Sequence, residues 1–155
     1  MQPITFKPIG VIHNTVTDLK NAPRSEHMAE GVTATVEIYP QYTQGLTDLD
    51  GFSHIILLVH FHLSEGYDLM ATPFLGNTRR GVFATRSPRR PNPLGMSIVK
   101  LVKIVGNILQ IENTEMVDGT PVLDIKPYVP PPYRREIVKL GWLEQHIAGR
   151  DDTSI

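Results

Sequence analysis

The sequence predicts an all-β protein, a small β-barrel of about six or seven strands with one C-terminal helix. Apolar and polar side chains alternate in several segments with the period of two that half-buried strands have. Thirteen prolines and twelve glycines among 155 residues indicate many turns and few long helices. A G-x-G-x-x-G motif and an alternation of strands with long helices are both absent, so a Rossmann sheet is not expected.

The predicted strands differ in how they are covered. Segment 32–39 places valine, alanine and isoleucine opposite threonine and glutamate, as in a strand with one buried face. Segment 53–64 is almost continuously apolar, which is typical of a central strand covered on both faces. Gly106-Asn107 separates two alternating segments and predicts a tight hairpin. In chain order, the expected strands are residues 32–39, 53–64, 81–85, 97–105, 108–113 and 122–128.

Helical patterning is concentrated near the C-terminus. Residues 134–148 place isoleucine and leucine side chains on one stripe, and Gly149 follows as a stop signal. Residues 41–49 are expected to form one or two helical turns. The chain is therefore expected to be one domain, residues 1–150 including the helix, followed by a frayed tail at 151–155.

The composition of the chain excludes several kinds of site. The chain has no cysteine, which excludes disulfides and thiolate metal sites. His54, His60 and His62 share a parity, and His60-Phe61-His62 has the spacing of a metal dyad, but no third ligand stands nearby, so no metal is predicted. No apolar run reaches the roughly 18 residues of a membrane span, and the N-terminus lacks a signal pattern. A cytoplasmic location without membrane contact is expected.

Charge is concentrated in one place although the whole chain sums to −1. Five arginines and no acid lie between residues 79 and 90. Pro88, Pro91 and Pro93 stiffen residues 86–93, called here the arginine loop. A stiff loop holds its guanidinium groups at small entropic cost, which suits an anionic partner. The alternative is a rigid connection whose arginines are only solvated.

A second dense motif begins at Asp118. Residues 118–121, Asp-Gly-Thr-Pro and called here the Asp118 turn, have a strong turn composition. The turn either leads into the next strand or uses its backbone N–H and C=O groups to recognise the adenine edge of a cofactor. Asp124 and Lys126 follow on one face of the strand, and a rim position suits such a pair better than the core.

These motifs together resemble one protein family. The stretches GVFATRSPRRPNPLGMS (81–97) and DGTPVLDIKPY (118–128) are similar to the TrmO (YaeB/TsaA-like) family of S-adenosylmethionine-dependent tRNA methyltransferases. GFSHI (51–55), IGVIHN (9–14) and Pro23–Arg24 fit the same pattern. The resemblance covers about residues 6–130 and implies a β-barrel that binds the cofactor without a Rossmann sheet.

The resemblance also implies a reaction and its partners. The methyl group of S-adenosylmethionine would go to N6 of N6-threonylcarbamoyladenosine, next to the anticodon of tRNA, and the protein would be a homodimer. Bacterial members often extend into a second domain after the barrel, and this chain ends at Ile155. The cofactor-binding positions that match are Pro23, Arg24, Ser25, His62, Leu63, Arg86, Asp118, Gly119, Thr120 and Pro121.

The acceptor chemistry suggests roles for other residues. N6 belongs to a urea, so it is a poor nucleophile until it loses its proton, and either Asp118 or Asp124 is expected to be the base. Arg86 and Arg90 suit the threonine carboxylate and flanking phosphates through charge-assisted hydrogen bonds. Lys126 and Tyr128 complete the expected substrate contacts. Two alternatives stay open: a non-catalytic barrel that binds nucleotide or RNA, and a methyltransferase for small molecules.

Overall fold

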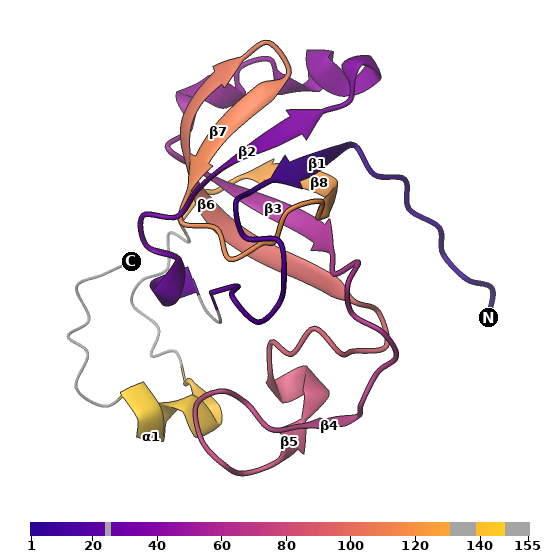
Figure 1. The fold of residues 1–155 in the computed structure, drawn as a ribbon, viewed down its shortest axis with the longest axis vertical. Helices are drawn as coiled ribbons and strands as arrows, with labels where there is room; N and C mark the ends of the chain where they lie inside the picture. Colours follow the sequence, from indigo (N-terminus) through magenta and orange to yellow (C-terminus); the bar gives the residue numbers. More distant parts are fainter. Residues whose placement is uncertain (24–25, 131–138, 148–155) are drawn as a thin grey trace.

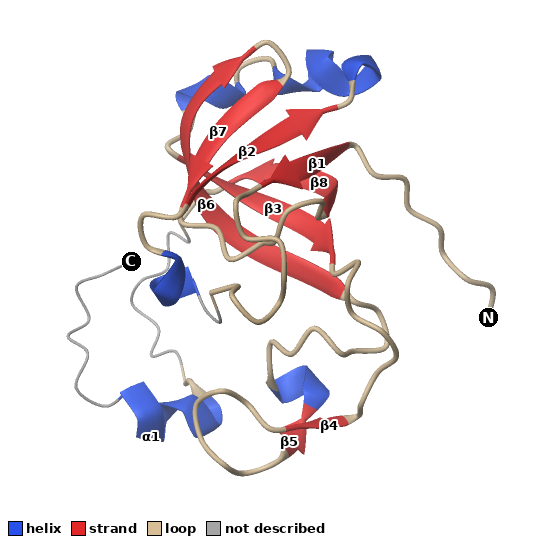
Figure 2. Ribbon diagram, viewed as in Figure 1, coloured by secondary structure: helices blue, strands red, loops and turns tan. Residues whose placement is uncertain are grey.

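A computed structural model describes residues 1–23, 26–130 and 139–147 of the chain. Its main body is a closed antiparallel barrel with the strand order β1-β2-β7-β6-β3-β8, in which β8 pairs back with β1 (Figures 1 and 2). The all-β prediction is confirmed. The barrel strands are β1 Gly10–His13, β2 Thr33–Ile38, β3 His54–His60, β6 Leu94–Val105, β7 Ile108–Glu112 and β8 Pro121–Pro127.

The alternation in the sequence places one side of each strand inside the barrel. In β2, Ala34, Val36 and Ile38 are buried, while the threonines and the glutamate face outward. Burying each of these side chains stabilises the fold by about 1.5–3 kcal/mol before entropic costs are subtracted. The fully buried aliphatic side chains of the barrel core, at 0% exposure, are Ile12, Val36, Ile55, Leu57, Val59, Val99, Leu109 and Val122.

Strand β3 corrects the expectation for residues 53–64. Its inward side chains are fully buried, but its outward ones are only half-buried, so the strand is completely covered on one face alone. The strand ends at His60. His62 lies in the turn that follows, and its backbone N–H donates to the His60 carbonyl at 2.8 Å. His54 and His60 share a face of β3, whereas His62 does not belong to the strand.

The predicted hairpin is present between β6 and β7. Gly106 has φ +60°, the left-handed conformation that such a turn needs. Strand β6 begins at Leu94, three residues before the predicted start, because the pairing with β3 extends to His60. A register shift between Leu101 and Lys103 interrupts the pairing with β7, as a β-bulge does.

Residues 61–93 leave the barrel and form a separate lobe below it in Figure 1. The lobe holds two short strands, β4 (Met70–Ala71) and β5 (Arg80–Gly81), and the 3₁₀ helix η4 (Val82–Ala84). The prediction of a strand over residues 81–85 is therefore wrong, because the chain forms a 3₁₀ helix directly after Gly81. One hydrogen bond, from the Val82 N–H to Leu69 O at 2.9 Å, joins the two arms of the lobe.

The predicted helix over 134–148 is not continuous in its described part. Residues 131–138 and 148–155, including the predicted tail, lie outside the described residues. Gly141 has φ +59°, and the chain then forms a 3₁₀ helix, η5 (Gly141–Leu143), and one α-helical turn, α1 (Glu144–Ile147). The remaining 3₁₀ helices are η1 Glu26–Ala29, η2 Pro40–Leu46 and η3 Leu49–Gly51. In the described ranges, no helix has the length and apolar character needed to cross a membrane.

Candidate active site

The Asp118 turn lies against the end of strand β1. Gly119 has φ +76°, a conformation in which a side chain would be strained. The hydroxyl of Thr120, only 2% exposed, donates to Val117 O at 2.7 Å and so points into the protein. The backbone N–H bonds of the turn join Asp118 to Val16 O at 2.7 Å, Gly119 to Ile12 O at 2.8 Å and Thr120 to Val117 O at 3.3 Å.

These bonds correct one expectation for the turn. All three N–H groups already have acceptors within the protein, so they are not available to recognise an adenine edge. The Asp118 carboxylate is 43% exposed and so stays accessible to a ligand. The Thr120 hydroxyl, in contrast, is held inside the protein by its hydrogen bond to Val117 O.

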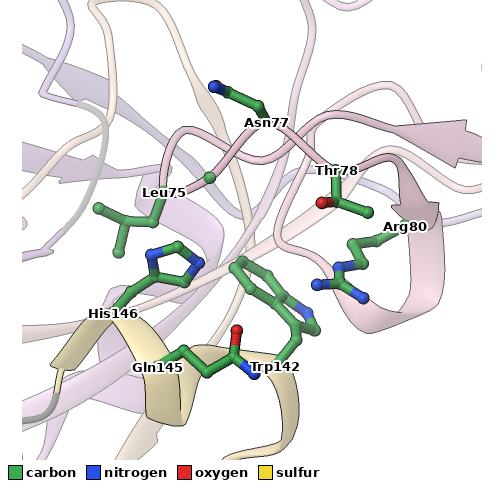
Figure 3. Close-up of a pocket in the computed structure, with 8 residues that line it drawn as sticks. Leu75, Asn77, Thr78, Arg80, Trp142, Gln145 and His146 are labelled. Atoms are coloured by element: carbon green, nitrogen blue, oxygen red, sulfur yellow. The ribbon is translucent and has the colours of Figure 1, made fainter.

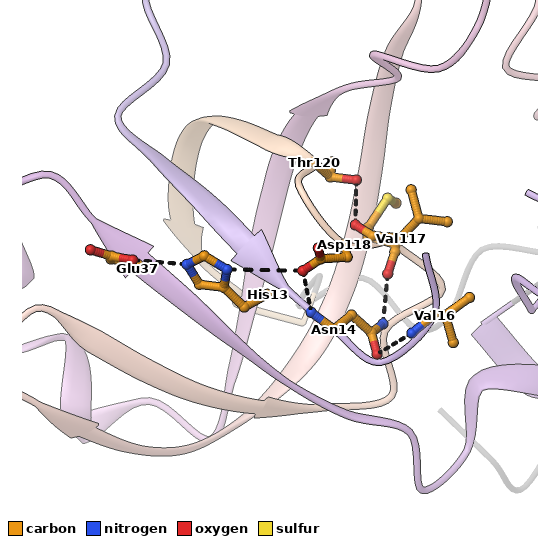
Figure 4. A network of polar contacts seen from close by, with 8 residues as sticks. His13, Asn14, Val16, Glu37, Val117, Asp118 and Thr120 are labelled. Atoms are coloured by element: carbon orange, nitrogen blue, oxygen red, sulfur yellow. Dashed lines mark hydrogen bonds and ion pairs between the residues drawn. The ribbon is translucent and has the colours of Figure 1, made fainter. Parts of the chain in front are cut away.

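A polar network that the sequence reasoning missed surrounds Asp118 (Figure 4). His13 Nε2 lies 2.8 Å from Glu37 Oε2, and His13 Nδ1 lies 3.9 Å from Asp118 Oδ1. The Asn14 backbone N–H donates to the same Asp118 oxygen at 3.0 Å. The motif IGVIHN could have indicated this network. In an alternating strand His13 lies on the outward face, as does Glu37 on the neighbouring strand β2.

The network borders an open groove of about 570 Å³. Its lining combines polar side chains (threonine, asparagine, glutamine and His13), the apolar Ala34, Val102 and Ile111, and the acids Glu112 and Asp118. Its lining does not include His62 or Arg86. The groove therefore presents Asp118 to solvent beside β1 and β2.

His62 stands on the other side of the Asp118 turn. Its Nε2 lies 3.6 Å from the position that a Cβ would take on Gly119. Burial lowers the pKa of His62, and the nearby His60 lowers it further, while Asp118 acts in the opposite direction. His62 is consequently a neutral imidazole at pH 7, next to the turn that the sequence singled out.

The arginine loop is built partly by its own side chains. Arg90 is half-buried, and its Nη1 donates to the Thr85 carbonyl at 3.0 Å and to the Ser87 carbonyl at 3.2 Å. Arg89 fixes the opposite arm of the lobe, with Nε 2.8 Å from Asp68 Oδ2. Arg86 is exposed. Arg90 thus has a structural role in addition to any contact with substrate.

The two sequence motifs meet through residues 61–64. The Phe61 N–H donates to Pro93 O at 2.8 Å, and the Ser64 hydroxyl donates to Pro88 O at 3.0 Å. Since His62 also lies against Gly119, one short segment contacts both the Asp118 turn and the arginine loop. Leu63, 43% exposed, presents an apolar surface between these contacts.

Other predicted site residues lie elsewhere. Asp124 and Lys126 do share a face of β8, with 2.8 Å between Oδ2 and Nζ, and both are solvent-accessible. The Tyr128 N–H donates to His54 O at 3.1 Å, at the start of β3. The seven-residue strand β8, about 20 Å long, separates this end from the Asp118 turn. The monomer does not bring Lys126 and Tyr128 to His62.

The remaining predicted cofactor-binding positions are Pro23, Arg24, Ser25 and Pro121. Pro23 is half-buried and Pro121 pairs with Val11 at the start of β8, while Arg24 and Ser25 lie outside the described residues. Within the described ranges, no three histidine or acidic side chains are grouped so that they could hold a metal ion.

Comparisons with known proteins show which family the chain is similar to. A "probable S-adenosyl-L-methionine-binding protein" of Pyrococcus abyssi is 46% identical over 153 residues, which are 96% of this chain and 83% of the relative. The tRNA (adenine(37)-N6)-methyltransferase of Escherichia coli is 38% identical over 140 residues, 84% of this chain. This chain spans 60% of the length of that enzyme.

A solved structure and a family model show the same relationship. The crystal structure of TrmO from Pseudomonas aeruginosa superposes with a TM-score of 0.73 at 33% identity, over 90% of this chain and 62% of that one. The family model described as the tRNA-methyltransferase O N-terminal domain matches residues 11–132, which include the arginine loop and the barrel except for Gly10, the first residue of β1. The chain belongs to the TrmO family, and its barrel is that family's N-terminal domain.

Proposed function

We propose that this chain is an S-adenosylmethionine-dependent tRNA methyltransferase that acts on N6 of N6-threonylcarbamoyladenosine, next to the anticodon. The E. coli relative is named for N6 methylation of adenine 37 in tRNA, and the P. abyssi relative for binding S-adenosylmethionine. The threonylcarbamoyl group is the finer part of the proposal. It is what the resemblance to the TrmO family implies, and the arginine side chains beside the site support it, because they suit an acceptor that carries a carboxylate.

One structural relationship carries the proposal. Residues 61–64 contact the Asp118 turn through His62 and the arginine loop through Ser64, at 3.6 Å from the Gly119 Cβ position and 3.0 Å from Pro88 O. A donor bound along the turn would therefore lie within reach of an acceptor bound at the loop. Holding two reactants in line is most of what a methyl transfer requires.

The residues of this region fit S-adenosylmethionine. Because Gly119 has no side chain, only backbone lies between the turn and His62, whose Nε2 is 3.6 Å from the position of a Cβ. His62 is neutral because burial lowers its pKa, so it does not repel a positively charged sulfonium. The exposed Leu63 side chain offers an apolar contact for the adenine ring or the methylene chain.

The chemistry needs one proton acceptor. The cofactor supplies a methyl carbon whose bond to sulfur breaks as its bond to N6 forms, and the sulfur keeps the electron pair as a neutral thioether. The N6 proton must go to a base, and Asp118 is favoured over Asp124 by position. Asp118 lies beside His62, whereas Asp124 pairs with Lys126 at 2.8 Å on the outer barrel wall. The Asn14 N–H, 3.0 Å away, fixes the Asp118 carboxylate.

The acceptor would be held at the arginine loop. Arg86 is the main candidate for the threonine carboxylate, since it is exposed on the loop. Arg90 keeps part of its guanidinium for a ligand while Nη1 holds the Thr85 and Ser87 carbonyls. Lys126 and Tyr128 could join this site only from a second copy of the chain, because β8 places them at the other end of the barrel.

A homodimer belongs to the same proposal. The lobe and the adjoining outer face of β6 expose a group of large apolar side chains, which is unusual for a surface that faces only water. Each is more than 40% exposed: Leu63, Tyr67, Leu69, Met70, Phe74, Leu75, Phe83, Leu94 and Met96. Sedimentation of the wild type and of Phe83→Asp would test it, and a wild-type monomer at micromolar concentration would contradict it.

The function is tested by incubating the protein with labelled S-adenosylmethionine and tRNA that carries or lacks the threonylcarbamoyl group. We expect label in N6 of the modified adenosine, identified by mass spectrometry of the nucleosides. Label in the unmodified tRNA would retain the enzyme class and remove the threonylcarbamoyl specificity. Saturable cofactor binding without any label in RNA would favour a methyltransferase for small molecules, and no saturable binding would favour a non-catalytic barrel.

A further inference from the structure

A second, smaller cavity lies in the lobe, away from the Asp118 turn. It has a volume of about 130 Å³ and lies between two segments that are distant in sequence (Figure 3). One wall is the loop before β5, and the other is the turn of η5 and α1. The lining residues are Leu75, Gly76, Asn77, Thr78, Arg80, Trp142, Gln145 and His146.

Arg80 is the only arginine or lysine that lines this cavity in the described part of the chain. Its guanidinium carbon lies 5.6 Å from the centre of the Trp142 ring, an arrangement that orients the cation by its attraction to the π face. The Trp142 Nε1–H donates to Ala84 O at 2.8 Å and so fixes the ring. Among the described residues, no carboxylate lies within ion-pair distance of Arg80. An aromatic partner positions the charge without neutralising it.

The other polar lining groups are hydrogen-bond donors. Asn77, Thr78, Gln145 and His146 each carry an N–H or O–H group, and none of the described lining residues is acidic. The nearest acid in the sequence, Glu144, accepts a hydrogen bond from the Leu140 N–H at 2.9 Å. A cavity that combines a fixed cation with several donors and no carboxylate is suited to an anion.

Gly76 allows the cavity to form. It has φ +101°, and a Cβ at this position would stand 2.9 Å from His146 Nε2. A side chain there would push His146 away and separate the two walls. The imidazole can therefore lie close to the backbone of the loop, as Figure 3 shows.

We propose that this cavity is a phosphate-binding subsite that takes one backbone phosphate of the RNA substrate. The inference rests on the proposed tRNA methyltransferase function. It goes further by assigning a contact outside the methyl-transfer site. Its volume admits a phosphate group but not a whole nucleotide.

Position makes RNA the source of that phosphate. Trp142 bonds to Ala84, two residues before Arg86, so the cavity adjoins the start of the arginine loop. An RNA strand that presents its modified nucleoside at Arg86 would pass the cavity with a neighbouring phosphate. Contacts to phosphates set the register of a nucleic acid without reading its sequence.

The chain provides its own probe for the test. Trp142 is its single tryptophan, so fluorescence excited selectively at tryptophan reports on this cavity. Anticodon stem-loop RNA is titrated against the full-length protein, and inorganic phosphate is titrated separately. We expect a saturable change with RNA, and only a weak change with phosphate at millimolar concentration, because the single anion lacks the other contacts of the strand.

The test variants place a negative charge in the cavity. Gln145→Glu and Thr78→Asp change exposed lining residues, so the fold should be retained, and thermal melting checks this. Gln41→Glu is the matched control, since Gln41 is exposed in η2, at the opposite end of the molecule in Figure 1. We expect each cavity variant to weaken RNA affinity by about tenfold or more and to raise KM for tRNA. Gln41→Glu should bind RNA as the wild type does.

Each outcome has a defined meaning. Unchanged RNA affinity and unchanged KM in both cavity variants would overturn the subsite and leave the methyltransferase function intact. A fluorescence change with inorganic phosphate but none with RNA would assign the cavity to a free anion and overturn the RNA contact. A wild type that neither binds nor methylates tRNA would overturn both proposals. Cofactor affinity, measured by calorimetry, should be equal in all four proteins.

Discussion

His62 Nε2 lies 3.6 Å from the point where Gly119 would carry a Cβ atom. This contact joins the end of β3 to the turn before β8 at the place where the sequence motifs predicted a cofactor. It also decides which groups of the turn are available. The turn's N–H groups hold β1 and its own loop, and its open side faces His62. We expect the donor of the methyl group to lie beside this contact, along the Asp118 turn and His62.

Replacing Gly119 by alanine tests whether the cofactor lies along this contact. The residue has φ +76°, so the substitution should cost about 1–2 kcal/mol of unfolding free energy and should also weaken S-adenosylmethionine binding. Gly106→Ala is a matched control, because Gly106 has φ +60° and nothing within 4 Å of its Cβ position. Denaturant unfolding and calorimetry measure the two effects. Equal cofactor affinity in both variants would remove the turn from the binding site.

The neutral state of His62 predicts a pH dependence. Burial lowers its pKa in the folded protein, while the unfolded imidazole titrates near 6.5. As pH falls below about 6.5, the unfolded state therefore binds more protons than the folded state, and stability decreases. Above that pH, the imidazole is neutral in both states and contributes no pH dependence. We expect His62→Gln to lose less stability than the wild type between pH 7 and pH 5.

Cofactor binding should follow the same titration. A protonated His62 would repel the sulfonium, so the Kd for S-adenosylmethionine should rise below pH 6 in the wild type. In His62→Gln this rise should be reduced, although the affinity at pH 7 is already lower. Calorimetry at several pH values, with proton NMR of the imidazole, measures both quantities. An affinity that is flat with pH in the wild type would contradict the placement of His62 beside the sulfonium.

The barrel could be predicted because its strands are specified locally. Alternation along β2 and β7 and the glycine turn between β6 and β7 each act within a few residues. The errors arose where contacts distant in sequence decide the structure. Residues 81–85 look like a strand, but the chain turns at Val82, whose N–H bonds to Leu69 in the other arm of the lobe. Gly141 interrupts a helical stripe that its neighbours favour.

Of the candidate site, the sequence could predict some residues but not the contacts between their side chains. Motif resemblance singled out His62 and Gly119, and the fold brings these two together. The role of Arg90 within its loop and the link from His13 to Asp118 depend on side-chain geometry, which the sequence does not specify. The use of the turn's N–H groups by Ile12 and Val16 could not be foreseen either, since it follows from how β1 closes the barrel.

The two acidic candidates for the base can now be separated by experiment. Asp118→Asn should reduce kcat by about 100-fold or more, because removing a general base typically costs this much. Asp124→Asn breaks only an exposed pair with Lys126 and should leave kcat within about twofold. Single-turnover methyl transfer at saturating cofactor measures the chemical step. A large loss in Asp124→Asn with an active Asp118→Asn would reverse the assignment.

Substitutions of Arg86 and Arg90 should differ in their effects on stability and on methyl transfer. Arg90→Ala removes two hydrogen bonds from Nη1 to the Thr85 and Ser87 carbonyls, so it should lower the unfolding free energy by about 1–3 kcal/mol as well as methyl transfer. Arg86→Ala alters an exposed side chain of the same loop and should reduce kcat/KM for tRNA with a smaller loss of stability. Unfolding curves and tRNA methylation rates, measured on the same preparations, provide the comparison. If both variants lose stability and activity in equal proportion, Arg86 supports the loop and does not bind the acceptor.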